Sequence, residues 1–175
     1  LEPDMSGPYC DRRELFAASA AALGATAVAG QPKAKKYPFK KSINLWAFPY
    51  PEKMTLEQCL RLAKDAGFDG IELNYDLDSD LSPKAGPREL RDIRNAADKV
   101  GIAISGLCSF LFWPYSLTHN DPERRQKGLE LARKMIQAAN LLGTENLLVV
   151  PGAVYVPWLE NVEPVPNDVC DQRAK

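Results

Sequence analysis

The sequence has little of several features that would indicate a specific chemistry. It carries one histidine, His119, on a polar loop just before a helix start, where we expect a surface side chain rather than a metal ligand. Its four cysteines show no Cys-x-x-Cys pair and no framework spacing, which favours free thiols over disulfides. With 22 basic and 23 acidic side chains, the charge balance gives no support for a nucleic acid partner.

A long hydrophobic run is also missing, and the nearest approach to one lies at the front of the chain. Arg12 and Arg13 precede an alanine-rich stretch that is too short to span a bilayer, and 27–29 read Ala-Val-Ala, a cleavage pattern. The stretch has no 3.6-residue period, which argues against an amphipathic helix. It resembles a twin-arginine signal peptide. We therefore expect a signal over 1–30, a linker over 31–40, and export to the periplasm or another extracytoplasmic space, with a cytoplasmic protein as the alternative.

What the rest of the chain does contain is a repeated alternation of strands and helices. Short apolar strands are expected at 42–47, 70–74, 102–108 and 146–150, and each of the last three follows a helical pattern that ends at a glycine: Gly67, Gly101 or Gly143. Such units predict an α/β fold with a parallel sheet. An open doubly wound sheet and a segment of a TIM barrel both fit.

Two features favour the barrel. No Gly-x-Gly-x-x-Gly or Walker loop follows the first strand, so a nucleotide-binding sheet loses support. The long loops begin after the strands, at Phe48, Tyr75, Ser109 and Pro151, and a TIM barrel places its functional loops on that side. The sequence thus predicts parallel β/α units over 41–175, with about four strands of a barrel.

Several motifs in this region, taken in order, resemble the N-terminal half of the xylose-isomerase-like TIM-barrel superfamily of sugar phosphate isomerases and epimerases. The resemblance covers about residues 41–172 and rests on 43–46 (INLW), 66–73 (AGFDGIEL), 120–129 (NDPERRQKGL), 139–143 (ANLLG) and 149–152 (VVPG). It implies proton transfer next to a sugar carbonyl, assisted by a divalent metal such as Mn, Mg, Co or Zn.

The resemblance also implies where that chemistry lies. In this family the metal ligands and the acid/base glutamates come mainly from strands five to eight, whereas only four strands are expected here. Because the chain also opens on Leu1 rather than Met, we expect a fragment that is inactive alone. We assign it no catalytic residue and no metal ligand.

Four residues at strand ends are the candidates for contact with a small sugar substrate. Glu72 ends the second strand, where its carboxylate would face the barrel mouth; the alternative is a structural carboxylate bonded to a neighbouring amide. Trp46 and Phe48 follow the first strand and would form an apolar wall against a sugar, or pack in the core. Cys108 closes the third strand, as a pocket residue or a buried structural thiol.

Other functions remain open. The same barrel could serve a dehydratase or an enzyme of keto-sugar breakdown, or the chain could be a non-catalytic sugar-binding or assembly half-barrel. Open sheet edges and an uncovered inner face would favour a homo-oligomer. The single histidine argues against the endonuclease IV branch of the superfamily, which uses several zinc-binding histidines.

Overall fold

The computed structural model describes residues 38–160 and 163–175. The chain divides into two units, Leu1–Pro38 and Phe39–Lys175, and all helices and strands described below belong to the second. The predicted signal peptide over 1–30 lies outside the described residues, as does most of the predicted linker. Within the described ranges, no helix is long and apolar enough to cross a membrane.

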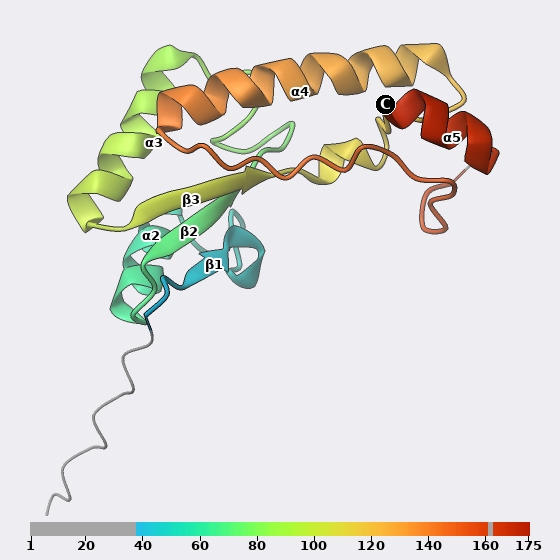
Figure 1. Ribbon diagram of the computed structural model, residues 1–175. Helices are drawn as coiled ribbons and strands as arrows, with labels where there is room; N and C mark the ends of the chain where they lie inside the picture. Colours follow the sequence, from blue (N-terminus) through green and yellow to red (C-terminus); the bar gives the residue numbers. More distant parts are fainter. Residues whose placement is uncertain (1–37, 161–162) are drawn as a thin grey trace, which may run out of the picture. The chain divides into compact units, whose positions relative to one another are not determined.

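A three-stranded parallel sheet in the order β1-β2-β3 forms the centre of the second unit (Figure 1). The strands are β1 (Ser42–Asn44), β2 (Gly70–Asn74) and β3 (Ala103–Cys108). Helices α2 (Leu56–Asp65) and α3 (Pro87–Val100) connect them, and α4 (Pro122–Leu142) follows β3. A short helix, α5 (Asn167–Ala174), comes last. The expected α/β fold with a parallel sheet is confirmed.

Local signals place the ends of these helices as predicted. Thr55 and Gln58 form a reciprocal capping box at the start of α2, an arrangement that typically stabilises a helix by about 1 kcal/mol. Asp121 accepts a hydrogen bond from the Glu123 N–H at the start of α4. Gly101 and Gly143 end α3 and α4 in the left-handed conformation, at φ 75° in each case.

The sheet has one apolar and one polar face. Ile71, Leu73 and Leu107 are fully buried in the hydrophobic core that the helices share with the sheet. The opposite face carries short polar side chains, and Ser42 and Ser105 hydrogen-bond across it through their hydroxyl groups. In a closed barrel the face without helices lines the packed interior, and ligands bind where the strands of that interior end.

The first strand is shorter than predicted. It ends at Asn44, and Leu45–Ala47 form a 3-10 helix, η1. The Asn44 side chain accepts a hydrogen bond of 2.8 Å from the Trp46 N–H. Asparagine favours such local bonds over a strand ladder, and this bond turns the chain out of the sheet.

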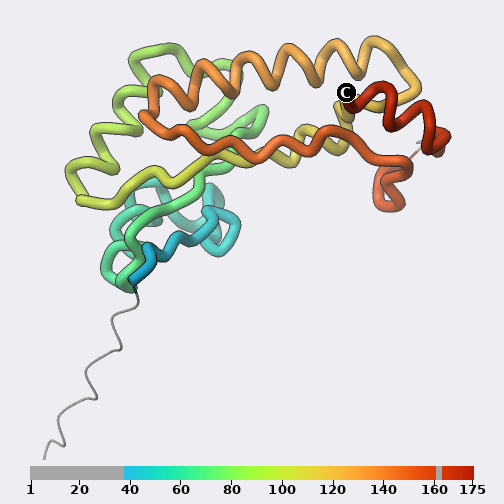
Figure 2. Tube along the Cα trace, viewed as in Figure 1, coloured from blue at the N-terminus to red at the C-terminus, as the bar shows by residue number. Residues whose placement is uncertain are grey.

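The expected fourth strand, 146–150, joins the sheet only through an isolated bridge between Leu107 and Leu147. Leu107 donates to the Asn146 carbonyl and accepts from the Leu148 N–H, at 3.0 and 2.8 Å. Figure 2 shows this segment running beside β3 before it reaches α5. The apolar composition of this segment indicates burial on both faces, but Leu148 is 55% exposed. Among the described residues no strand pairs with its other edge, so it lacks half of its ladder.

Helix α4 is rotated from the orientation that its sequence pattern indicates. The 3.6-residue period that contains Met135 and Leu142 would also turn Leu129 and Ile136 inward. These two side chains are 41% and 57% exposed, whereas Leu131 and Ala138 are buried. The rotation has a local cause in Gly128, where an added Cβ would collide with the Tyr115 carbonyl. A backbone approach this close is possible only without a side chain, and it fixes which face of α4 meets the core.

Candidate functional site

Four polar or thiol side chains meet at or near the carboxyl ends of the three strands. Glu72 was expected to end the second strand, but it lies two residues before Asn74, the last residue of β2. Asn44 ends β1, opposite Glu72 in the register of β1 with β2. Asn74 and Cys108 end β2 and β3 and are partners in the second register. Because parallel strands end at the same edge of a sheet, these residues form one group, which we call the strand-end cluster. A barrel fold uses this edge for function.

Asn44 lies at the centre of the strand-end cluster. Its Nδ2 donates to Glu72 Oε2 at 2.6 Å and to Cys108 Sγ at 3.1 Å. Its Oδ1 accepts from the Trp46 N–H, and because a backbone N–H can only donate, this bond fixes which side of the amide is oxygen. Both amide hydrogens therefore point into the cluster.

Cys108 contributes a neutral thiol to the strand-end cluster. It is 1% exposed, and burial, together with the nearby Glu72 carboxylate, raises its pKa to about 11, although the Asn44 hydrogen bond acts in the opposite direction. The thiol donates to Asn74 Oδ1 at 3.0 Å. At neutral pH the cluster thus holds a protonated sulfur atom and is poorly suited to thiolate chemistry.

The structure brings together two of the four predicted substrate contacts, Glu72 and Cys108. Trp46 is 59% exposed, and its backbone N–H, rather than its ring, bonds to the cluster through Asn44. Phe48 is half-buried and packs against the hydrophobic core, as the core-packing alternative expected. Glu72 is bonded to a neighbouring side-chain amide, and its half-buried carboxylate lies on the polar face of the sheet.

Sequence reasoning missed Asn44 and Asn74 as members of the strand-end cluster. A signal for Asn74 was present, because it follows Glu72 by two positions and therefore lies on the same face of its strand. The bond between Asn44 and Cys108 joins residues 64 positions apart in the sequence. A single sequence does not reveal such a pairing.

Two loops on the same side of the sheet are held together. Thr118, fully buried in the loop after β3, donates to the Ala153 carbonyl and accepts from the Ala153 N–H, at 3.1 Å each. The rings of Trp113 and Trp158 meet edge to face, with centroids 5.2 Å apart. These contacts join the loop after β3 to the segment that follows the bridged 146–150 stretch.

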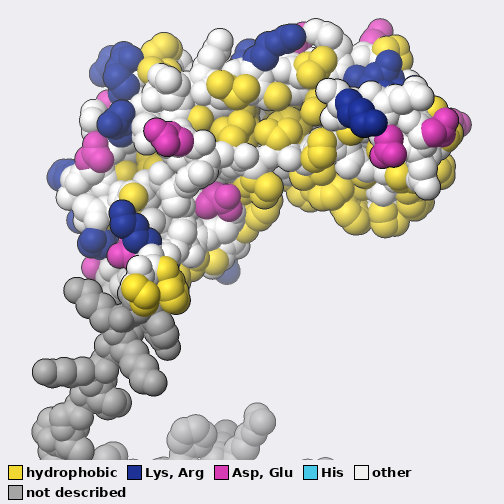
Figure 3. Space-filling view, in the orientation of Figure 1, with side chains coloured by type: hydrophobic (Ala, Val, Ile, Leu, Met, Phe, Trp, Pro, Cys, Tyr) yellow, Lys and Arg dark blue, Asp and Glu magenta, His cyan; other side chains and the backbone are white. Residues whose placement is uncertain are grey.

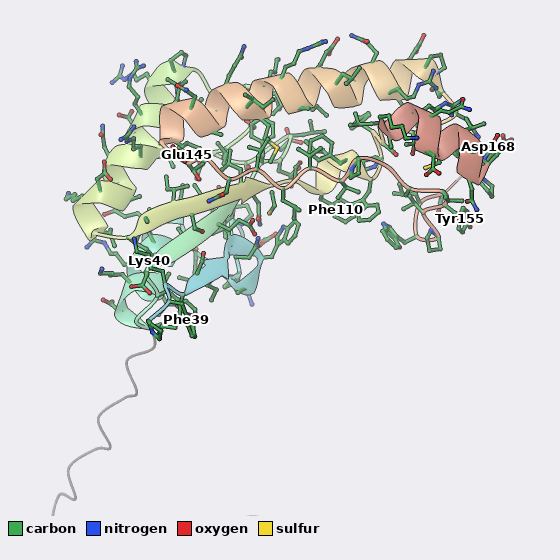
Figure 4. The ribbon with its side chains drawn as sticks, in the orientation of Figure 1. Phe39, Lys40, Phe110, Glu145, Tyr155 and Asp168 are labelled. Carbon is green, nitrogen blue, oxygen red and sulfur yellow. The ribbon has the colours of Figure 1, made fainter. Side chains whose placement is uncertain are left out.

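Apolar side chains are exposed around these loops. Phe110, Tyr155 and Trp158 are about half exposed. Figure 4 places Phe110 beyond the end of β3 and Tyr155 farther along the C-terminal segment. In Figure 3 hydrophobic side chains gather along this part of the surface. The exposed rings offer apolar contact area on the side of the sheet where the strands end.

His119 is more enclosed than predicted. Its Nδ1 accepts from the Asp121 N–H at 2.9 Å, while its Nε2 is buried with no hydrogen-bond partner among the described residues. Burial, reinforced by the nearby Arg124, lowers its pKa. The ring is therefore neutral at pH 7 and supports the turn into α4.

A hollow of about 510 Å³ lies elsewhere, between the loop after β2 and α3. It is open to solvent, and its acidic lining includes Asp78, Asp80, Glu89 and Asp92. The strand-end cluster is the better site candidate because its groups converge at the functional edge of the fold.

The side chains of the strand-end cluster do not form a binding site for a divalent metal. Within the described ranges, no three His, Cys, Asp or Glu side chains are grouped so that they could hold a metal ion. The strand-end cluster supplies one carboxylate, and its thiol is protonated at neutral pH. Mn²⁺ or Mg²⁺ prefers several hard oxygen ligands, which this cluster lacks.

Residues 60–175 match the xylose isomerase-like TIM barrel family. The match covers more than half of the chain and agrees with the observed β/α units. The chain belongs to this family.

The relatives and related structures include several sugar epimerases. L-ribulose-5-phosphate 3-epimerase UlaE of Shigella boydii is 35% identical over 104 residues, which are 58% of this chain and 37% of the relative. The corresponding protein of Escherichia coli gives the same values. The chain therefore spans well under half the length of these relatives.

Two solved structures share the fold. The apo form of 3-keto-D-glucoside 4-epimerase YcjR from E. coli superimposes with a TM-score of 0.55 and 20% identity, covering 77% of this chain and 46% of that one. D-psicose 3-epimerase, crystallised in the presence of D-fructose, gives a TM-score of 0.57 and 18% identity, with 78% and 45% covered. At these identities the likeness shows the fold alone.

Proposed function

We propose that this chain supplies the substrate-contacting strand ends of a sugar isomerase or epimerase. The observation that carries the proposal is the Glu72 carboxylate, held at the strand ends by Asn44 and beside the Cys108 thiol. The family match and the relatives named as sugar epimerases support the substrate class.

Each group of the cluster has a role that suits a polyhydroxyl ligand. The Glu72 carboxylate accepts a hydrogen bond from a sugar hydroxyl, which is stronger than a bond between neutral groups. The Asn44 amide keeps this carboxylate in place, and the protonated Cys108 thiol beside it adds a weak polar contact. The exposed Trp46 ring offers an apolar face to the carbon side of a sugar.

Proton transfer next to the sugar carbonyl is assigned to residues outside the strand-end cluster. A second carboxylate would be needed to move the proton between two faces of the carbon, and the cluster has only one. The divalent metal expected from the family resemblance likewise requires ligands from elsewhere. We therefore expect this chain by itself to bind sugar, and conversion of the sugar to need those further residues of the enzyme.

A non-catalytic sugar-binding protein is the second candidate, favoured by the same lack of a second carboxylate. A dehydratase or a keto-sugar-processing enzyme would use the same edge of the barrel. Export by a twin-arginine-like signal stays a prediction, because it concerns residues 1–30.

The test combines binding with turnover. Calorimetric titration with L-ribulose should detect binding to the unmodified chain and a loss of about tenfold or more in affinity for Glu72→Gln, which removes one charge-assisted hydrogen bond. Glu89→Gln, which changes an exposed carboxylate on α3, is the matched control and should bind normally.

Turnover is measured on the same samples with added Mn²⁺, Mg²⁺ or Co²⁺, and we expect none. Conversion of L-ribulose would contradict the assignment of proton transfer to other residues. Equal affinities of the unmodified chain and Glu72→Gln would contradict the proposed site.

A further inference from the structure

The hydrogen bonds around Asn44 run in one direction. The Trp46 N–H donates to Oδ1, and Nδ2 donates to both Glu72 and Cys108. Asn74 Oδ1 then accepts from the Cys108 thiol. Every donor in this series of hydrogen bonds meets an acceptor, so the Asn44 side chain has one orientation. A reversed amide would lose the bonds to Glu72 and to the Trp46 N–H.

Asn44 is also the residue that joins the three strands at this edge. It belongs to β1, whereas the carboxylate that it holds belongs to β2 and the thiol to β3. Its bond to Glu72 is short, at 2.6 Å, and a charged acceptor shortens a hydrogen bond. Glu72 is half-buried, so without this bond its side chain is free to turn toward solvent.

We propose that Asn44 is a positioning residue, whose amide holds the Glu72 carboxylate against the Cys108 thiol and so presents it in one geometry to a sugar hydroxyl. This inference rests on the proposed function for the role of the sugar. The positioning itself is a property of the free chain and is tested without any ligand.

The Cys108 thiol reports on the position of the carboxylate. A negative charge close to a thiol disfavours the thiolate, and this influence decreases as the charge moves away. If Asn44 holds Glu72 near the sulfur, the influence of Glu72 on the ionisation of Cys108 depends on residue 44. A double-mutant cycle measures this dependence directly.

The experiment follows the Cys108 Cβ resonance in ¹³C-cysteine-labelled chain as the pH is raised, with the signal assigned by its loss in Cys108→Ser. Glu72→Gln should lower the ionisation midpoint by about 1 pH unit, because it removes a like charge beside the thiolate. In the Asn44→Ser background the same substitution should lower it by at most about half as much. Serine retains an acceptor for the Trp46 N–H but cannot reach Glu72.

Asn146→Ser is the matched control. Asn146 donates to the Ser105 carbonyl, outside the strand-end cluster, and in that background Glu72→Gln should have its full effect. If Asn44→Ser does not fold, as judged by circular dichroism, Asn44→Thr replaces it, because threonine keeps an acceptor for the Trp46 N–H, adds no charge and lacks the two amide donors. A reduced effect is expected there too.

Equal effects of Glu72→Gln with and without the Asn44 amide would overturn the inference. The outcome is separable from that of the sugar titration. Thiol coupling without L-ribulose binding would leave Asn44 as the positioning residue while removing the proposed function. Binding of L-ribulose without thiol coupling would support the proposed function and overturn the positioning role of Asn44.

Discussion

Two glycines show how differently single residues are constrained in this fold. Gly128 lies inside α4, and its Cα faces the Tyr115 carbonyl so closely that an added Cβ would collide with it. Gly67 has φ 83°, but an added Cβ would meet nothing within 4 Å. The first position is limited by packing and the second by backbone conformation.

Alanine substitutions separate these two constraints. Gly128→Ala should destabilise the chain by about 1–3 kcal/mol, since the helix must move away from the Tyr115 backbone. Gly67→Ala should cost only about 1 kcal/mol, the usual cost of a left-handed alanine. Urea unfolding followed by circular dichroism measures both values. A smaller effect at Gly128 than at Gly67 would contradict the packing argument.

The raised pKa of the Cys108 thiol implies that the chain loses stability at alkaline pH. Its pKa in the folded chain is about 11, above its ordinary value of 9.0. As the pH rises from 9 to 11 the unfolded thiol ionises while the folded one does not, so the free energy of unfolding falls. Burial raises the pKa of Tyr75 to about 12, which extends the loss to higher pH.

Urea unfolding at pH 8 and pH 10.5 tests this dependence. The decrease in the free energy of unfolding between the two pH values should be smaller for Cys108→Ala than for the unmodified chain. Ser109→Ala, at the neighbouring buried position, is the control and should keep the full decrease. Identical decreases in all three proteins would show that the Cys108 thiol does not ionise differently in the two states.

At the scale of elements, α5 is attached to the turn before α4 by one guanidinium group. Arg173 Nη1 lies 3.0 Å from the Thr118 carbonyl, 3.1 Å from the His119 carbonyl and 3.2 Å from Asn120 Oδ1. Arg125 donates to the same turn, at 2.6 Å from the His119 carbonyl. The two arginines satisfy carbonyl groups that would otherwise be left at a chain reversal.

Removal of this guanidinium should loosen α5. Arg173→Ala is expected to raise the hydrogen-exchange rates of the amides in 167–174 about fivefold or more, the effect of losing about 1 kcal/mol of local stability. Arg133→Ala, an exposed position on α4, should leave them unchanged. Unaltered exchange in Arg173→Ala would mean that other contacts hold α5.

The elements that the sequence predicted well depend on local chemistry. The glycines at 101 and 143 act within a turn of chain, and the structure ends α3 and α4 at them as expected. The strand-end cluster was predicted only in its Glu72 and Cys108 members. Asn44 was missed because its bonds to Glu72 and Cys108 span 28 and 64 positions.

The errors concern interactions between distant elements. The rotation of α4 follows from the contact of Gly128 with Tyr115. The spacing of apolar residues along one helix does not predict a contact with a residue outside it. The 146–150 segment has the composition of a strand buried on both faces, and a regular strand ladder there needs a partner on each edge. Among the described residues only β3 pairs with it, through a single bridge.

For the molecule as a whole, the polar face of the sheet is the feature that links fold and function. A barrel segment that carried only scaffold residues would need no carboxylate at its strand ends. Here a network of bonds holds a carboxylate there, in a family whose relatives include sugar epimerases. Association through the open edges of the sheet stays a prediction, and sedimentation of the purified chain measures it.

The most direct test of this account is to map where a sugar binds. Amide chemical shifts of ¹⁵N-labelled chain, recorded during titration with L-ribulose, should change at 44–46, 72–75 and 108–110, and the changes should disappear in Glu72→Gln. Shift changes confined to the acidic hollow around Asp78 and Asp92, or changes that persist unaltered in Glu72→Gln, would contradict the assignment of the site.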